Sequence, residues 1–120
     1  MTIQRFGVTP RFADSVVHRG VVYLVEVPSN LEAGAGEQTA NLLASVDRLL
    51  AQAGSDKSRL LMVTIYLADM ADYDAMNAVW EAWLPSGSAP ARACVQARLA
   101  KPEYRVEMVL SAATVDGENA

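Results

Sequence analysis

The sequence predicts an α+β domain in which a mixed β-sheet is covered on one face by two helices. Three observations lead to this prediction: several apolar stretches with strand character, two stretches with helical periodicity between them, and a length of 120 residues, which suits one core. The composition is that of a folded chain, because 52% of the residues are hydrophobic and 20% are charged. We expect a single domain over residues 1–115 and a solvated tail over residues 116–120.

The N-terminal part of the chain has the pattern of strands. A short strand is predicted at residues 3–6, and residues 16–17 and 21–27 flank His18-Arg19-Gly20 with the spacing of a β-hairpin. The segment VVYLVEV, residues 21–27, is almost continuously apolar, which predicts a strand that is covered on both faces.

The middle of the chain changes to helical periodicity. Within residues 36–53, apolar residues recur at i, i+4, i+7 and i+11, and Gly54 follows where a left-handed C-terminal cap is expected. After an apolar strand at 60–67, Asp69 or Asp72 is expected to cap a second helix. Four large side chains share one face of that helix: Tyr73, Met76, Trp80 and Trp83.

Two further strands, at residues 91–99 and 104–112, complete a ββ(β)αβαββ order and hence a mixed sheet with both helices on one face. Such a sheet leaves its second face without cover. Burial against other copies of the chain is the simplest way to cover it, so we expect a homo-oligomer.

Polar side chains alternate along the first of these two strands. Arg92 and Cys94 point to one face, whereas Val95 and the alanines between them point to the other and resemble core. If the last two strands pair, Glu107 lies near Arg92 and Cys94. An arginine fork suits a carboxylate, a thiol beside it can have a lowered pKa, and a nearby carboxylate can relay a proton. The alternative is a structural ion pair between Arg92 and Glu107 beside a small buried thiol.

Composition argues against several other classes of protein. The net charge of −4 and the lack of a basic run give no sign of a nucleic-acid or anionic-membrane surface. Cys94 and His18 are the single cysteine and histidine, so we expect no Cys/His metal cluster. The N-terminus lacks an apolar signal core, and the longest apolar run, residues 60–63, is far too short to span a membrane. A cytoplasmic protein is expected.

Three segments resemble one known family. The stretch PARACVQARLAKPEYRVEM is similar to the signature of the Rid/YjgF family, the reactive intermediate deaminases, in which Pro-x-Arg-x-x-Val leads to a turn and a Val-Glu-hydrophobic strand. VVHRGVVYLVEV and AGSDKSRLLMVTIYLADMADYDAMNAVWEAW also match the family's order of elements, so that the resemblance runs from about residue 11 to residue 113.

This resemblance implies a chorismate-mutase-like α+β fold and a homotrimer with clefts between adjacent subunits. It also implies an activity, the hydrolysis of reactive 2-imino or 2-enamino acids to keto acid and ammonia without metal or cofactor. In this sequence, Arg92 would hold the substrate carboxylate. Glu107 and Cys94 would be the catalytic residues, Glu107 by helping to orient the attacking water and Cys94 from the lining of the pocket.

The opposite wall of the pocket departs from the family pattern. Family members commonly carry Tyr, Ser and Gly where this sequence has Phe12, Val25 and Glu26. Glu26 either enters the cleft, where it would pair with Arg92 or repel acidic substrates, or it is a solvated glutamate at a strand end.

The missing phenol, hydroxyl and glycine leave a second function open, in which the chain binds a small metabolite without turning it over. A third function, ribonuclease activity reported for parts of the family, is disfavoured by the acidic charge balance.

Overall fold

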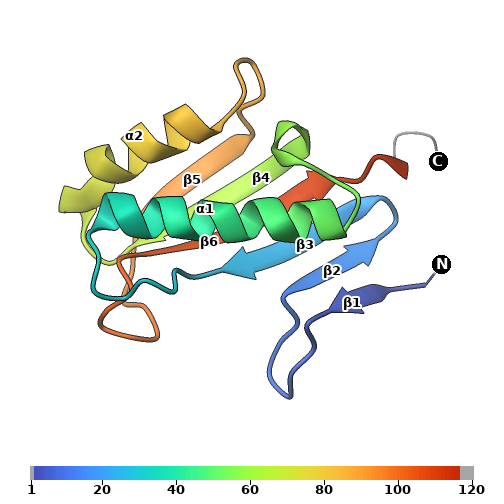
Figure 1. Ribbon diagram of the computed structural model, residues 1–120, viewed down its shortest axis with the longest axis horizontal. Helices are drawn as coiled ribbons and strands as arrows, with labels where there is room; N and C mark the ends of the chain where they lie inside the picture. The colour runs from blue at the N-terminus through green and yellow to red at the C-terminus, as the bar shows by residue number, and fades with distance from the viewer. Residues whose placement is uncertain (1, 117–120) are drawn as a thin grey trace.

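The structure, a computed structural model, describes residues 2–116 and contains one six-stranded sheet with two helices on the same face (Figure 1). The strands in chain order are β1 (Gln4–Phe6), β2 (Ser15–His18), β3 (Val21–Glu26), β4 (Leu60–Leu67), β5 (Ala91–Gln96) and β6 (Val106–Ala113). The helices are α1 (Ala35–Gln52) and α2 (Tyr73–Trp83), and short 3-10 turns precede β4 (Lys57–Arg59) and α2 (Met70–Asp72).

The strands lie in the order β1-β2-β3-β6-β4-β5. β4 and β5 pair in parallel, as expected for two neighbouring strands joined by the helical crossover α2, and the other neighbours in this order are antiparallel. The predicted fold class and order of elements are therefore confirmed. The single domain over 1–115 stays a prediction, and residues 117–120 of the predicted tail lie outside the described part of the chain.

The core lies between the sheet and the two helices. The apolar stripe of α1 meets alternate residues of β3, β4 and β6, and the periodicity of both elements accounts for which residues are buried. The side chains fully buried there include Val22, Leu42, Leu43, Val46, Leu50, Val63, Ile65, Met76 and Met108.

The helix ends follow the predicted signals in part. Gly54 follows α1 with a φ of +76°, the left-handed conformation expected of a C-terminal cap. Asp69 caps the 3-10 turn, where its side chain accepts a hydrogen bond from the Ala71 amide at 2.9 Å. Asp72 directly precedes α2 and makes no capping hydrogen bond from its side chain; instead it lies 3.5 Å from the Arg105 guanidinium.

The second face of the sheet is not covered by any helix formed by residues 2–116. Tyr23 and Val25 of β3 are 53% and 47% exposed on this open face, and alternate residues of β4, β5 and β6 share it: Met62, Val95 and Val109. The prediction that VVYLVEV is covered on both faces is thus wrong for the chain on its own. The expectation that one sheet face lacks cover is confirmed.

Candidate functional site

Arg92 lies on β5 and faces α2. Its Nη2 donates a hydrogen bond to the Tyr73 hydroxyl at 3.2 Å, and its guanidinium carbon lies 5.7 Å from the Tyr73 ring centroid and 6.0 Å from that of Trp80. Among residues 2–116 no carboxylate forms an ion pair with Arg92. The side chain is thus a half-buried cation fixed on an aromatic shelf, with hydrogen-bond donors that no acidic residue among residues 2–116 occupies.

This placement reverses part of the sequence interpretation. Ala91, Ala93 and Val95, which resemble core in the sequence, lie exposed on the open face, whereas Arg92 and Cys94 lie on the helix face. Alternation defines two faces of a strand but does not say which one is buried. At this edge of the sheet the aromatic rings of α2 provide the cover, and these rings accommodate a guanidinium.

Cys94 follows Arg92 on the same face. Its side chain packs against the core, and it lines a hollow of about 590 Å³ together with Met70, Ala71, Tyr73 and Asp74. Burial raises the pKa of the Cys94 thiol, and the smaller opposing effect of the Arg92 charge does not reverse this. The prediction of a lowered thiol pKa is wrong, because loss of hydration outweighs the neighbouring cation. Cys94 is therefore suited to line a pocket as a neutral thiol rather than to act as a nucleophile.

Glu107 does not join Arg92 and Cys94 within one chain. β4 lies between β5 and β6, and Glu107 pairs with Tyr66 on the open face. The expected pairing of the last two strands is therefore wrong, and so is the alternative of an Arg92–Glu107 ion pair. The parallel pairing of β5 with β4 after the α2 crossover explains this, because the following turn must pass over the end of β4 to reach β6.

The three residues of the opposite wall do come together. Phe12, Val25 and Glu26 line a hollow of about 360 Å³ with Ala13, Asp14 and Val27. The Phe12 ring is largely exposed at this hollow, and its backbone is fixed by the Thr9 hydroxyl, which accepts from the Phe12 amide and donates to the Phe12 carbonyl at 3.1 Å each. This hollow therefore contains a ring and two carboxylates.

Glu26 is neither a freely solvated glutamate nor a partner of Arg92. Partial burial raises its pKa, the nearby Asp14 carboxylate raises it further, and Arg48 on α1 opposes both effects. Glu26 and Arg92 lie on the same sheet face but on β3 and β5, three strand spacings or about 14 Å apart across the sheet, and Arg92 is also two residues out of line with Glu26 along β5. Within a single chain the two side chains cannot form the ion pair that the sequence left open.

The raised pKa of Glu26 predicts a pH-dependent stability effect. A carboxyl group with a higher pKa in the folded state favours folding when protonated, and this contribution is lost as the pH rises through the folded-state pKa. We therefore expect Glu26→Gln to melt at a higher temperature than the wild type at pH 7. The difference should close below about pH 4, where a glutamate is protonated in both states.

Thermal denaturation between pH 3.5 and 8 measures this effect, with Glu81→Gln as the matched control because Glu81 is exposed on α2. A Glu26→Gln variant that is less stable than the wild type at pH 7 would contradict the expected sign.

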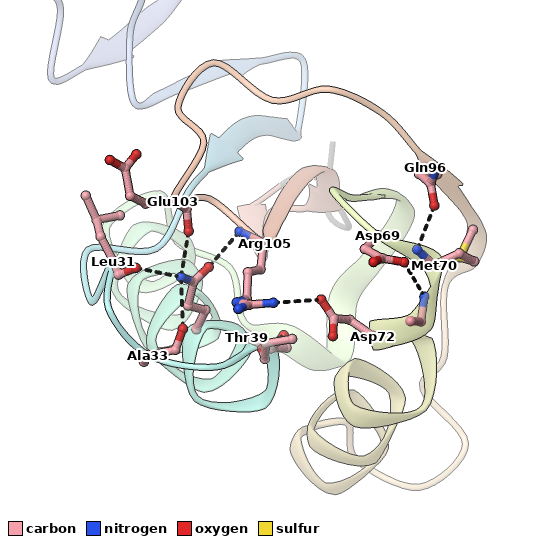
Figure 2. Close-up of polar contacts among 12 residues, drawn as sticks. Leu31, Ala33, Thr39, Asp69, Met70, Asp72, Gln96, Glu103 and Arg105 are labelled. Carbon is pink, nitrogen blue, oxygen red and sulfur yellow. Dashed lines mark hydrogen bonds and ion pairs between the residues drawn. The ribbon is translucent and has the colours of Figure 1, made fainter.

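A polar clamp orders the loops at the end of the sheet next to Arg105. Gln38 of α1 is fully buried; its Nε2 donates to the backbone carbonyls of Glu103, Ala33 and Leu31 at 2.9, 3.3 and 3.4 Å. Its Oε1 accepts from the Arg105 amide at 2.8 Å (Figure 2). One side chain thereby joins the loop before α1 to the turn that leads into β6.

The same end of the sheet is tied to the segment before α2. Gln96, the last residue of β5, accepts a hydrogen bond from the Met70 amide at 2.7 Å through Oε1, and the ion pair of Arg105 with Asp72 lies beside it (Figure 2). These contacts fix the end of β5 against the turn that precedes Tyr73. These contacts thus hold β5, which carries Arg92, next to the start of α2, which carries the aromatic residues beside Arg92.

Two kinds of feature are absent from the described residues. Residues 2–116 contain no group of three or more His, Cys, Asp and Glu side chains that could hold a metal ion. Over the same residues no helix is long and apolar enough to cross a membrane.

The fold and the half-buried Arg92 define a small α+β protein whose edge strand presents a cation that has no acidic partner in the described part of the chain. Residues 2–114 match the family model described as Endoribonuclease L-PSP. The chain is 49% identical over 113 residues to the RutC family protein YoaB of Escherichia coli K12, covering 94% of this chain and 99% of the relative. It is 35% identical to the 3-aminoacrylate deaminase RutC of Acinetobacter baylyi, covering 80% and 77% of the two chains.

Solved structures agree with these sequence matches. The YjgF-family protein NMB1025 of Neisseria meningitidis superimposes with a TM-score of 0.91 at 52% identity, covering 95% of this chain and 96% of that one. A structure from Salmonella typhimurium described as a putative translation initiation inhibitor gives a TM-score of 0.88 at 46% identity, covering 94% and 98%. The chain therefore belongs to the YjgF/RutC family, as the resemblance of its segments predicts.

Proposed function

We propose that this protein hydrolyses reactive 2-imino or 2-enamino acids to keto acid and ammonia. The observation that carries the proposal is Arg92, a half-buried guanidinium with no acidic partner in residues 2–116, held beside a hollow that Cys94 lines. A planar fork of this kind suits a carboxylate, which it can hold with two charge-assisted hydrogen bonds. The name of the Acinetobacter relative, a 3-aminoacrylate deaminase, supports an enamino acid as substrate, with the amino group of that compound on C3 instead of C2.

Hydrolysis of an imine requires mainly that the protein positions the substrate and the attacking water. The carbon of a protonated imine is already electrophilic, so water adds to it, a proton passes to nitrogen, and the C–N bond breaks to give keto acid and ammonia. Arg92 would hold the carboxylate while Cys94 lines the pocket as a neutral thiol. Glu107 stands on the open face of the sheet, so its proposed role in orienting the water requires a site that the assembled protein completes.

A homotrimer is part of this proposal. The open face exposes a set of apolar side chains that a chain on its own would leave in water: Tyr23, Val25, Met62, Val95 and Val109. Contact with neighbouring subunits would cover them, and it would also allow the hollow of Phe12, Val25 and Glu26 to approach Arg92 of another subunit. We also propose a reducing, cytoplasmic setting, which the single free thiol of Cys94 supports.

The direct test uses an amino-acid oxidase to generate imino acids in the cuvette. Semicarbazide then traps the imino acid that has not been hydrolysed. We expect the purified protein to lower the amount of trapped imino acid, and to speed ammonia release, in proportion to its concentration. If imino acids from neutral, basic and acidic amino acids all decay at the uncatalysed rate, the proposed activity is wrong.

Binding without turnover is the second candidate, and one observation favours it. The hollow of Phe12, Val25 and Glu26 is lined by Ala13, Asp14 and Val27 in addition, so no hydroxyl group reaches it from these residues. Small carboxylates that raise the melting temperature of a protein without deaminase activity would support this function. Although the family model is described as an endoribonuclease, the net charge of −4 and the lack of a basic run in the sequence do not favour RNA binding, and we do not propose that activity.

A further inference from the structure

Tyr73 lies beside Arg92, at the hollow from which a ligand would contact the guanidinium. It is the first residue of α2, its side chain is 39% exposed, and it lines the same hollow as Cys94. Its hydroxyl oxygen accepts the hydrogen bond from Arg92 Nη2, and its ring lies beneath the guanidinium. Tyr73 is therefore in contact with both the cation and the empty space next to it.

The direction of this hydrogen bond leaves the phenol proton free. A tyrosine hydroxyl is one donor as well as an acceptor, and here the acceptor side faces Arg92. Over the described residues no protein group accepts the Tyr73 proton. Arg92 also keeps further N–H groups, because a guanidinium has five and Tyr73 takes one. Both residues thus retain donors at the same place.

We propose that Tyr73 is a second anchor for the substrate carboxylate, donating its hydroxyl proton to an oxygen that Arg92 also holds. This inference rests on the proposed function, in which Arg92 binds that carboxylate. The Tyr73 ring, together with Trp80, in addition fixes the plane of the guanidinium, so less rotamer freedom is lost when a ligand binds.

The neighbourhood of Tyr73 also restricts the class of ligand. Met70 and Ala71 supply apolar surface to the hollow, and Asp74 supplies a carboxylate. Asp74 disfavours a second negative charge on the ligand at this point. The site described by these residues suits a small monocarboxylate with an apolar remainder, and 2-oxobutyrate, a stable keto-acid product, is a suitable probe.

The experiment compares Tyr73→Phe with wild-type protein in two measurements, binding of 2-oxobutyrate by calorimetry and hydrolysis of the corresponding imino acid. We expect the Kd and the KM to rise about 10-fold, as for loss of one hydrogen bond to a charged group, while kcat and the melting temperature change little. Tyr104→Phe is the matched control. It also removes a tyrosine hydroxyl, but from the segment before β6, and it should leave both constants unchanged.

The outcomes separate this inference from the proposed function. If the wild type binds or turns over the carboxylate and Tyr73→Phe does so with wild-type constants, the role assigned to Tyr73 is wrong while Arg92 keeps its own. If the wild type neither binds 2-oxobutyrate nor hydrolyses any of the neutral, basic and acidic imino acids, the proposed function fails and Tyr73 loses its role with it.

Discussion

Replacing Arg92 by alanine will lower kcat/KM for imino-acid hydrolysis by about 100-fold or more. Two charge-assisted hydrogen bonds to a carboxylate are lost together, and each is worth about 1.5–3 kcal/mol. No other cation lies on the aromatic shelf of Tyr73 and Trp80 in residues 2–116, so no neighbour can substitute for the guanidinium. Steady-state kinetics with oxidase-generated imino acids measure the loss.

Two variants make the result specific to the arginine fork. Arg92→Lys keeps the charge but not the bidentate geometry, so we expect it to recover only a small part of the activity. Arg98→Ala removes an exposed arginine that follows β5, and it should retain wild-type kinetics. Near-normal kcat/KM in a folded Arg92→Ala protein would show that Arg92 is not the anchor.

Replacing Gln38 by leucine will destabilise the fold by about 3–5 kcal/mol. The change keeps the approximate volume but removes hydrogen bonds to three carbonyls and to the Arg105 amide, and it leaves buried polar groups without partners. Because these groups belong to two loops far apart in the sequence, no local rearrangement can satisfy both. Urea denaturation measures the effect: the midpoint should fall while the m value stays unchanged.

Thr39→Val is the matched control for this variant. Thr39 is the next residue of α1 and is equally buried, but its hydroxyl makes one hydrogen bond, to the Ala35 carbonyl within the same helix. We expect a loss of about 1 kcal/mol or less. If Gln38→Leu is no less stable than Thr39→Val, the loops do not depend on the clamp.

Periodicity predicts most of this fold. The switch from strand-like to helix-like spacing places both helices and the strand at 60–67, because burial of one face is a local property that the sequence records directly. Strand partners are not local. The last two strands are neighbours in the sequence, yet β4 lies between them, since the crossover through α2 pairs β5 with β4 first.

The residues of the candidate site also divide into those that a sequence pattern predicts and those that only the three-dimensional fold brings together. Phe12, Val25 and Glu26 could be grouped from the family pattern, and the structure places them around one hollow. Tyr73 could not be assigned to Arg92, because only the crossover brings the start of α2 over β5. Gln38 did leave a signal: it precedes Leu42 by four residues, so a polar amide occupies the apolar face of a helix, where it needs buried partners.

The aromatic shelf also makes the site optically observable. The chain contains two tryptophans; their ring centroids are 5.5 Å apart, and the indole nitrogen of Trp83 donates to Asp47 of α1 at 3.0 Å. The ring centroid of Trp80 also lies 6.0 Å from the guanidinium carbon of Arg92. Indole emission depends on the surrounding electric field, so an anion that neutralises Arg92 acts on Trp80, one of the two tryptophans. Titration of the natural tryptophans therefore follows occupancy of this site without a label.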